Sequence, residues 1–250
     1  MIVIKNNREL NIMREAGRIS ARALRLAGEA VEPGVTTAYI DNLIHKYIES
    51  QGATPSFLGY GGFPKSSCIS VNNVVIHGIP SDKCVLKQGD IVSIDVGAQF
   101  NGFHGDNAYT FACGDVTKEA KALMDATKES LFEGIKKAVI GNRIGDISST
   151  VQEYIEARSY SVVRDFVGHG VGAKLHEDPS VPNFGTKGRG ARLLEGMTIA
   201  IEPMVNAGVH NVNILEDEWT TVTQDGKLSA HFEHTIAITK DGPVILTLPD

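Results

Sequence analysis

Two acidic residues stand inside an otherwise apolar hairpin sequence, and this limits what the chain can fold into. Two strand-like segments within 91–111 are joined by Asn101-Gly102, which supplies the positive φ angles of a two-residue turn. With this turn Asp95 faces Ala108, and Asp106 lies diagonally next to Asp95 on the same face, about 7–8 Å away. A three-residue loop would send the two acids to opposite faces.

The negative charge of such a pair of acids has to be balanced. Two like charges in an apolar hairpin repel each other and lose hydration, so they require a cation, a shared proton or a basic partner. No lysine or arginine lies between Lys87 and Lys118. The segment favours metal ligands; in the alternative interpretation Asp95 caps a turn and Asp106 accepts backbone N–H groups.

Composition excludes several classes of protein. Lysine plus arginine number 24 against 30 aspartate plus glutamate, a net charge of −6, so neither direct nucleic-acid binding nor an anionic membrane is indicated. Three cysteines, Cys68, Cys84 and Cys113, fit no disulfide framework, and no stretch of 18 apolar residues occurs. We expect a soluble cytoplasmic protein folded as a single domain over residues 1–250.

The sequence indicates a repeated unit of two helices followed by strands. Apolar spacing predicts helices over 10–27, 40–48, 123–131 and 147–155, with strands near 69–71 and 74–76. A constant offset of 107 matches Gly34, Ile40, Ile44, Tyr47, Ile48, Glu49, Leu86, Gly89, Ile94 and Asp95 to Gly141, Ile147, Val151, Tyr154, Ile155, Glu156, Leu193, Gly196, Ile201 and Glu202. The sequence therefore predicts an α+β fold of two pseudo-symmetric halves, about 5–114 and 115–250, each with two helices and antiparallel strands.

The repeat predicts a second pair of acids. Glu202 corresponds to Asp95, and Glu233 corresponds to Asp106 after an insertion within 205–228, where no strong periodicity exists. If the halves pack about a pseudo-twofold axis, four carboxylates converge, and two divalent cations would balance their charge.

A nitrogen ligand is available in Gly168-His169-Gly170, where the glycines would let the chain bend toward the metal. Oxygen-rich ligation with one imidazole suits Mn, Fe or Co, with Zn as a further candidate. The alternative is that this glycine-rich run is only a loop.

Other catalytic motifs are absent from the sequence: it has no G-x-S-x-G elbow, no H-E-x-x-H helix and no P-loop. His77 and His176 each stand beside a turn. If they line the cleft they could hydrogen-bond a substrate carbonyl or oxyanion; otherwise they are surface or supporting histidines.

The motifs together resemble the type I methionine aminopeptidases, from about residue 5 to 245. The resemblance is carried by Asn72-Asn73-Val74-Val75-Ile76-His77-Gly78-Ile79-Pro80, Asp95 with Asp106, Gly168-His169-Gly170-Val171-Gly172, Ile201-Glu202-Pro203-Met204 and Phe232-Glu233-His234-Thr235. It implies the pita-bread fold shared with X-Pro aminopeptidase, prolidase and creatinase, with one curved sheet covered by helices.

The resemblance also implies roles for individual residues. Two divalent ions (Co, Mn, Fe or Zn) would be bound by Asp95, Asp106, His169, Glu202 and Glu233. A water or hydroxide bridging the two ions would attack the first peptide carbonyl, Glu202 would take its proton, and His77 and His176 would contact the substrate.

Family pockets for the methionine side chain match Tyr60, Phe63, Cys68 and Trp219, with Phe57 and Leu175 aligned less securely. Ordinary core packing is the alternative for these residues. Asn72, Val74 and Ser229 resemble a family site for a monovalent cation.

The implied function is metal-dependent removal of the N-terminal methionine from newly made proteins, with a preference for a small second residue. The expected partners are the N-termini of nascent proteins, with transient ribosome contact, no direct nucleic acid, no membrane and a monomeric state. The rival hypotheses are an X-Pro aminopeptidase-like hydrolase and a peptide-binding module without activity. A two-metal phosphoesterase is disfavoured because the strands with the acids lack the arginine or lysine that phosphate would need.

Overall fold

The helices begin where the sequence supplies hydrogen-bonding caps. The Asn6 side chain accepts the N–H groups of Arg8 and Glu9, and the Glu9 carboxylate accepts the N–H of Asn6. Thr36 and Thr117 cap two further helices through their hydroxyl oxygens. The structure, a computed structural model, describes residues 1–249 and has helices α1 (Asn7–Glu29), α2 (Thr37–Ser50), α3 (Lys118–Lys136) and α4 (Ile144–Glu156). The four helices expected from the apolar spacing are confirmed.

The strands are short except for the central hairpin. They are β1 (Thr54–Pro55), β2 (Cys68–Val71), β3 (Val74–Ile76), β4 (Ile91–Phe100), β5 (Phe103–Ala112), β6 (Ser161–Val162), β7 (Gly168–Gly170), β8 (Glu177–Val181), β9 (Thr198–Ile201), β10 (Met204–Asn206), β11 (Val212–Ile214), β12 (Thr221–Thr223), β13 (Ser229–His231), β14 (Glu233–Thr239) and β15 (Gly242–Ile245), with a 3₁₀ turn at Tyr60–Gly62.

The main sheet is antiparallel and runs in the order β1-β4-β5-β14-β9-β7-β8, with β2 also paired to β4 and β15 to β14. At its centre β5 lies beside β14, so the strand pairs β4–β5 and β9–β14 meet through their second strands. The α+β fold of two similarly built halves is confirmed. The repeat boundaries at 5–114 and 115–250, and the assignment of one domain, stay predictions.

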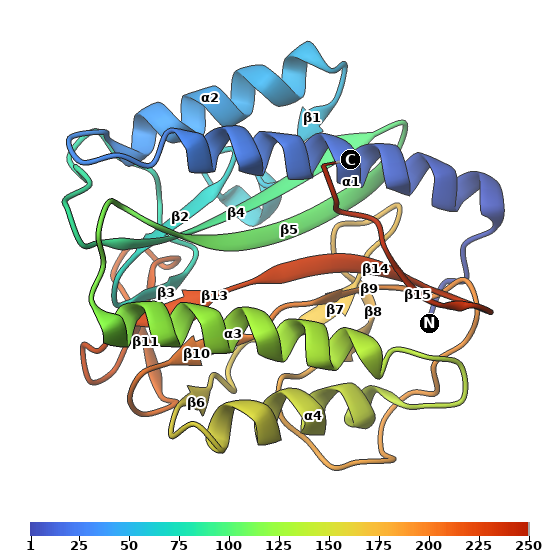
Figure 1. Cartoon of the computed structure of the whole chain (residues 1–250). Helices are drawn as coiled ribbons and strands as arrows, with labels where there is room; N and C mark the ends of the chain where they lie inside the picture. The colour runs from blue at the N-terminus through green and yellow to red at the C-terminus, as the bar shows by residue number, and fades with distance from the viewer. Residues whose placement is uncertain (250) are drawn as a thin grey trace.

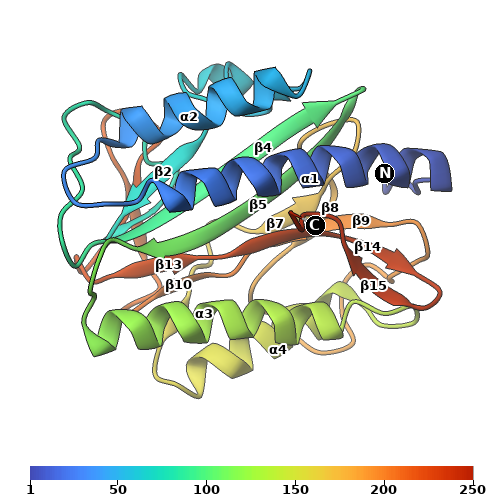
Figure 2. The ribbon, with the colours of Figure 1, turned by 45° about the horizontal axis from the view of Figure 1, so that its top comes forward.

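Helices α1 and α2 lie along the β4–β5 part of the curled sheet, and α3 and α4 lie along the part that contains β9 and β14 (Figures 1 and 2). Ile44 of α2 packs with Ile94 of β4 in one core cluster, and Ile147 of α4 packs with Ile201 of β9 in another. Because strand side chains alternate, the neighbours of Ile94 and Ile201 point away from the helices. Those neighbours include Asp95 and Glu202.

The hairpin that carries the first two acids has the expected register. Phe100 pairs with Phe103 and Asp95 with Ala108, and the turn residues Asn101 and Gly102 have φ of 48° and 83°. Asp106 therefore lies diagonal to Asp95 on the same face, as the two-residue turn predicts.

The insertion within 205–228 is more ordered than its sequence indicates. It contains part of β10 and the hairpin β11–β12, and β12 pairs with β3. Each of these strands has three residues, too few for an apolar period to show.

None of the helices in the described part of the chain is long and apolar enough to cross a membrane.

Candidate active site

The sheet register alone places five candidate ligands on one face. Asp95 and Glu233 both oppose Ala108, one from each side of β5, and Asp106 lies two residues along β5 on the same face. Continuing the β14–β9 register by one residue opposes Glu233 with Glu202. Continuing the β7–β9 register by one residue opposes His169 with Ala200, on the Glu202 face.

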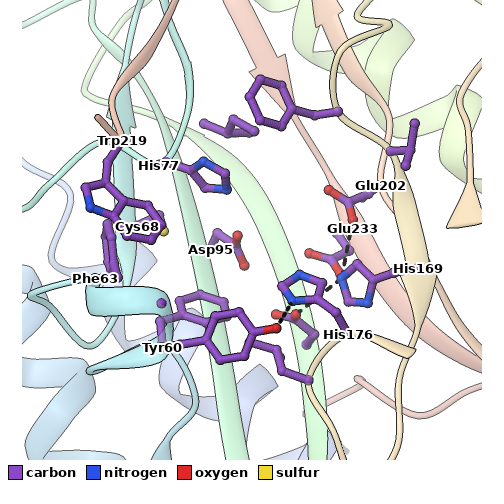
Figure 3. Close-up of a pocket in the computed structure, with 17 residues that line it drawn as sticks. Tyr60, Phe63, Cys68, His77, Asp95, His169, His176, Glu202, Trp219 and Glu233 are labelled. Atoms are coloured by element: carbon purple, nitrogen blue, oxygen red, sulfur yellow. Dashed lines mark hydrogen bonds and ion pairs between the residues drawn. The ribbon is translucent and has the colours of Figure 1, made fainter. Parts of the chain in front are cut away.

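The side chains do converge. His169 Nε2 lies 3.8 Å from Asp106 Oδ2 and 3.5 Å from Glu202 Oε1. Ligand atoms of Asp106, His169 and Glu233 lie within 4.8 Å of one another, and all three residues are buried. Figure 3 shows Asp95, His169, Glu202 and Glu233 around one cavity, which Asp106 also lines.

The carboxylates are short of partners. Asp95 Oδ1, Asp106 Oδ1 and Glu233 Oε1 are buried and accept no hydrogen bond from the described residues. Burial raises the pKa of Asp95, Asp106, Glu202 and Glu233, and for Asp95, Glu202 and Glu233 repulsion between the acids raises it further. Asp95 lies within strand β4, so the alternative in which it caps a turn is wrong. The Asp106 carboxylate does interact with the backbone N–H of Asn107, but this contact leaves its Oδ1 without a partner among the described residues. Orphaned buried oxygens beside an imidazole fit a divalent cation.

His169 is prepared as a neutral ligand. Burial, and then the neighbouring His176, lower the pKa of His169 to about 3. Its Nδ1 lies 2.8 Å from the carbonyl oxygen of Gly170, so Nδ1–H can donate to that oxygen and leave the Nε2 lone pair facing the acids.

The glycines beside His169 serve close packing, which differs from the sequence interpretation. Gly168 and Gly170 belong to strand β7, so the run is not simply a loop. A Cβ would lie 2.4 Å from Ala200 O at Gly168 and 2.3 Å from Asp178 O at Gly170. Only glycine lets β7 fit between its neighbours.

Two threonine hydroxyls fix the backbone around the acids. Thr235 Oγ1 accepts the N–H of Asp106 at 3.1 Å and donates to its carbonyl oxygen at 2.7 Å. Thr110 Oγ1 does the same for His231, at 2.9 and 2.8 Å. These clamps join β5 to the strands that carry His231 and Glu233.

An apolar cavity of about 220 Å³ adjoins the acids. Tyr60, Phe63, Cys68 and Trp219 line it as expected, and so do Phe57 and Leu175. No lysine or arginine among the described residues lines it. Cys68 pairs with Asp95 across β2 and β4, which places the thiol and the carboxylate side by side.

His77 and His176 both face this cavity, so they are not simply surface histidines. The His77 ring meets Phe166 and Trp219 edge to face, and burial lowers the pKa of His77 to about 4. His176 lies at the exposed rim, where its Nδ1 is 2.7 Å from Tyr60 Oη and its ring centroid is 4.1 Å from that of His169 (Figure 3).

Several lining residues were missed from the sequence. Ile76, Phe166 and Val167 line the cavity, and their only signal was proximity to His77 or His169 along the chain. The buried Nε2 of His231 lies 3.6 Å from Glu202 Oε2 and has no hydrogen-bond partner among residues 1–249. His231 stands two residues before Glu233, and this spacing in a strand was the signal that could have found it.

The residues of the expected monovalent-cation site are partly brought together. Ser229 N–H donates to the carbonyl oxygen of Asn72 at 2.8 Å, and Val74 pairs with Val222 in the adjoining sheet. A cation there stays a prediction.

Comparison with known proteins identifies the family. The model of metallopeptidase family M24 matches residues 11–240. The chain belongs to metallopeptidase family M24. Within M24, a methionine aminopeptidase of Clostridium acetobutylicum is 55% identical over 99% of both chains.

Solved M24-type structures agree with the fold. The methionine aminopeptidase of Thermotoga maritima matches with a TM-score of 0.98 at 46% identity, over 99% of this chain and 100% of that one. A prolidase from Pyrococcus horikoshii matches with a TM-score of 0.80 at 25% identity, over 100% of this chain and 65% of that one. The pita-bread fold is therefore confirmed, and the chain has a buried group of Asp106, His169 and Glu233 that could hold a metal ion.

Proposed function

We propose that this chain is a methionyl aminopeptidase that removes the N-terminal methionine from newly made proteins. The main observation behind the proposal is that buried acids with unpartnered oxygens lie beside an apolar cavity large enough for one side chain. The family relationship and the methionine aminopeptidases that match at full length support it.

Two divalent ions (Co, Mn, Fe or Zn) would be held by Asp95, Asp106, His169, Glu202 and Glu233. Four carboxylates need four positive charges, and within residues 1–249 no lysine or arginine lines the site. When bound, such ions polarise the peptide carbonyl and lower the pKa of an attacking water. The free α-amine of the substrate would also lie at this cluster, which restricts cleavage to the first residue.

The apolar cavity would take the methionine side chain. Phe63 and Trp219 lie edge to face with ring centroids 5.1 Å apart, and Cys68 is buried beside them. Aromatic rings and a thiol suit a polarisable thioether. The absence of charged groups at this end would disfavour polar first residues.

The histidines would act as neutral hydrogen-bond donors. Burial lowers the pKa of His77 to about 4, and desolvation also lowers the pKa of His176, so the uncharged ring is favoured in both. With its Nδ1 occupied by Tyr60 Oη, His176 would use Nε2 toward the carbonyl oxygen as negative charge develops there. Glu202, whose pKa is raised by burial, would accept the proton from the attacking water.

The remaining expectations belong to this proposal as well. We expect preference for a small second residue, action in the cytoplasm with transient ribosome contact, a monomeric state and a monovalent cation near Asn72, Val74 and Ser229.

An assay with metal-reconstituted protein tests the proposal. Met-Ala-Ser should be cleaved fastest, Leu-Ala-Ser more slowly and Ala-Pro-Ala hardly at all, while Met-Leu-Ser reports on the second residue. Preference for Ala-Pro-Ala would instead support the X-Pro hypothesis. Tight binding of Met-Ala-Ser without turnover would support the binding module.

A further inference from the structure

A buried ion pair lies behind the turn that carries His176. Lys5 Nζ lies 2.6 Å from Glu177 Oε2, and the two side chains are only 2% and 7% exposed. The ammonium also donates to the carbonyl oxygen of Val3 at 3.1 Å. A pair this buried costs desolvation, unlike the exposed pair Lys121–Asp125, so its placement calls for a role.

The Glu177 carboxylate organises the turn before it. Its Oε1 accepts the N–H of Lys174 at 3.1 Å, and the N–H of Gly172 donates to the carbonyl oxygen of Lys174 at 3.0 Å. A Cβ on Gly172 would lie 2.4 Å from Glu177 Oε1 and 2.6 Å from Lys5 Cε. The turn is therefore closed around the ion pair without spare room.

This turn connects the two histidines of the site. Gly170, next to His169, pairs with Glu177, next to His176, where β7 meets β8. Any movement of Glu177 would carry His176 away from Tyr60 and from the cavity. The backbone of Lys5, at the other end of the ion pair, is also held in place, because its N–H donates to the carbonyl oxygen of Gly196 at 2.8 Å.

We infer that Lys5 is a positioning residue that acts through Glu177 to hold His176 in reach of the substrate carbonyl. Lys5 does not line the cavity, so it touches neither the acids nor the substrate. The inference rests on the proposed function, in which His176 contacts the developing oxyanion.

The first test compares Lys5→Met with Lys174→Met in the metal-reconstituted protein. Lys174 is an exposed lysine of the same turn that contacts Glu177 through its backbone N–H, so replacing its side chain removes the same charge and keeps this contact. Lys5→Met should lower kcat for Met-Ala-Ser by about 100-fold with little change in KM, because misplacing a catalytic group by about 1 Å has that cost. Lys174→Met should leave kcat unchanged. Equal, small effects of both changes would overturn the inference.

A double variant separates positioning from stability. Lys5→Met alone leaves an unpaired buried carboxylate, whereas Lys5→Met with Glu177→Gln leaves none, so the double variant should recover thermal stability. Its kcat should nevertheless stay low, because the Lys5–Glu177 ion pair no longer holds the turn that carries His176. Recovery of kcat together with stability would show that the pair only avoids an unpaired charge, and would refute positioning.

Two further readouts distinguish failure of this inference from failure of the proposed function. In a His176→Ala background Lys5→Met should cause no additional loss of kcat, whereas a multiplicative loss would exclude action through His176. Hydrogen exchange of segment 171–178 needs no turnover: it should be faster in Lys5→Met than in Lys174→Met. Unchanged exchange refutes the inference even if the parent protein cleaves none of the peptides, an outcome that would refute the proposed function separately.

Discussion

At the scale of single residues, three acids beside the apolar cavity have an oxygen atom without a hydrogen-bond partner. Asp95, Asp106 and Glu233 each bury an oxygen that accepts no hydrogen bond from the described residues. Each such group costs about 1–3 kcal/mol or more when charged, so a fold would not keep three of them without a bound cation. Replacing one ligand should therefore cost function more than stability.

Asp106→Asn removes one negative charge from the cluster while keeping the side-chain shape. We expect turnover of Met-Ala-Ser to fall by about 1,000-fold or more, since losing several kcal/mol of electrostatic stabilisation has that effect. Metal titration by calorimetry should show weaker binding. Asp125→Asn, an exposed acid of α3, is the matched control and should behave like the parent. Full activity of Asp106→Asn after chelator treatment would contradict the metal role.

His77 gives a prediction about pH. Burial lowers the pKa of His77 from 6.5 to about 4 in the folded protein. Between these values the unfolded chain binds a proton that the native state does not, so the stability that depends on neutral His77 is lost as the pH falls from about 6.5 to 4.

The variant His77→Asn removes this effect and suits the backbone, because asparagine tolerates the φ of 57° at this position. Urea unfolding at several pH values should show the parent losing up to about 3 kcal/mol more than the variant over that range. Taking the difference in the free energy of unfolding between the two proteins at each pH cancels the contribution of the other titrating groups. Parallel curves would mean that His77 is not buried in neutral form.

At the scale of elements, one glycine of the central hairpin allows the first helix to approach it, and another allows the hairpin to turn. A Cβ on Gly105 of β5 would lie 2.4 Å from the backbone nitrogen of Gly17 in α1. At Gly102, in the turn of the same hairpin, no atom lies within 4 Å, but φ is 83°. The two positions thus require glycine for different reasons, one steric and one conformational.

This difference predicts unequal effects of the same substitution. Gly105→Ala should lower the free energy of unfolding by about 3 kcal/mol or more, because the added methyl group would force the backbone of α1 away from the hairpin. Gly102→Ala should cost about 1–2 kcal/mol, and Gly102→Asn less, because asparagine tolerates positive φ. Denaturant unfolding measures all three. A larger loss for Gly102→Ala than for Gly105→Ala would contradict the assigned contact.

At the scale of the whole molecule, the acids come from both halves of the sheet. Asp95 and Asp106 lie on the β4–β5 pair, and Glu202 and Glu233 on or beside the β9–β14 pair. A cation bound by these acids would therefore tie the two halves together across the β5–β14 junction. Metal removal should affect global stability as well as catalysis.

Chelation should abolish peptide cleavage and lower the thermal midpoint. Re-adding Mn²⁺ or Co²⁺ should raise the thermal midpoint as the metal concentration increases. At a metal concentration of 100 times the dissociation constant, the free energy of unfolding should be higher by about 2.7 kcal/mol. Differential scanning calorimetry across a metal series measures this. Asp106→Asn should show a much smaller rise, and an equal rise in both proteins would place the stabilising ion elsewhere.

Local patterns in the sequence determined the caps of the helices, the two-residue turn at Asn101-Gly102 and the adjacency of Asp95 and Asp106, because each depends on residues a few positions apart. Similarity between distant segments added Glu202 and Glu233 as counterparts. Only the tertiary structure decided that β5 pairs with β14, that the β11–β12 hairpin brings Trp219 to His77, and that Lys5 reaches Glu177. These contacts join residues separated by more than 100 positions, and their partners are selected by the packing of the whole chain, which no local period records.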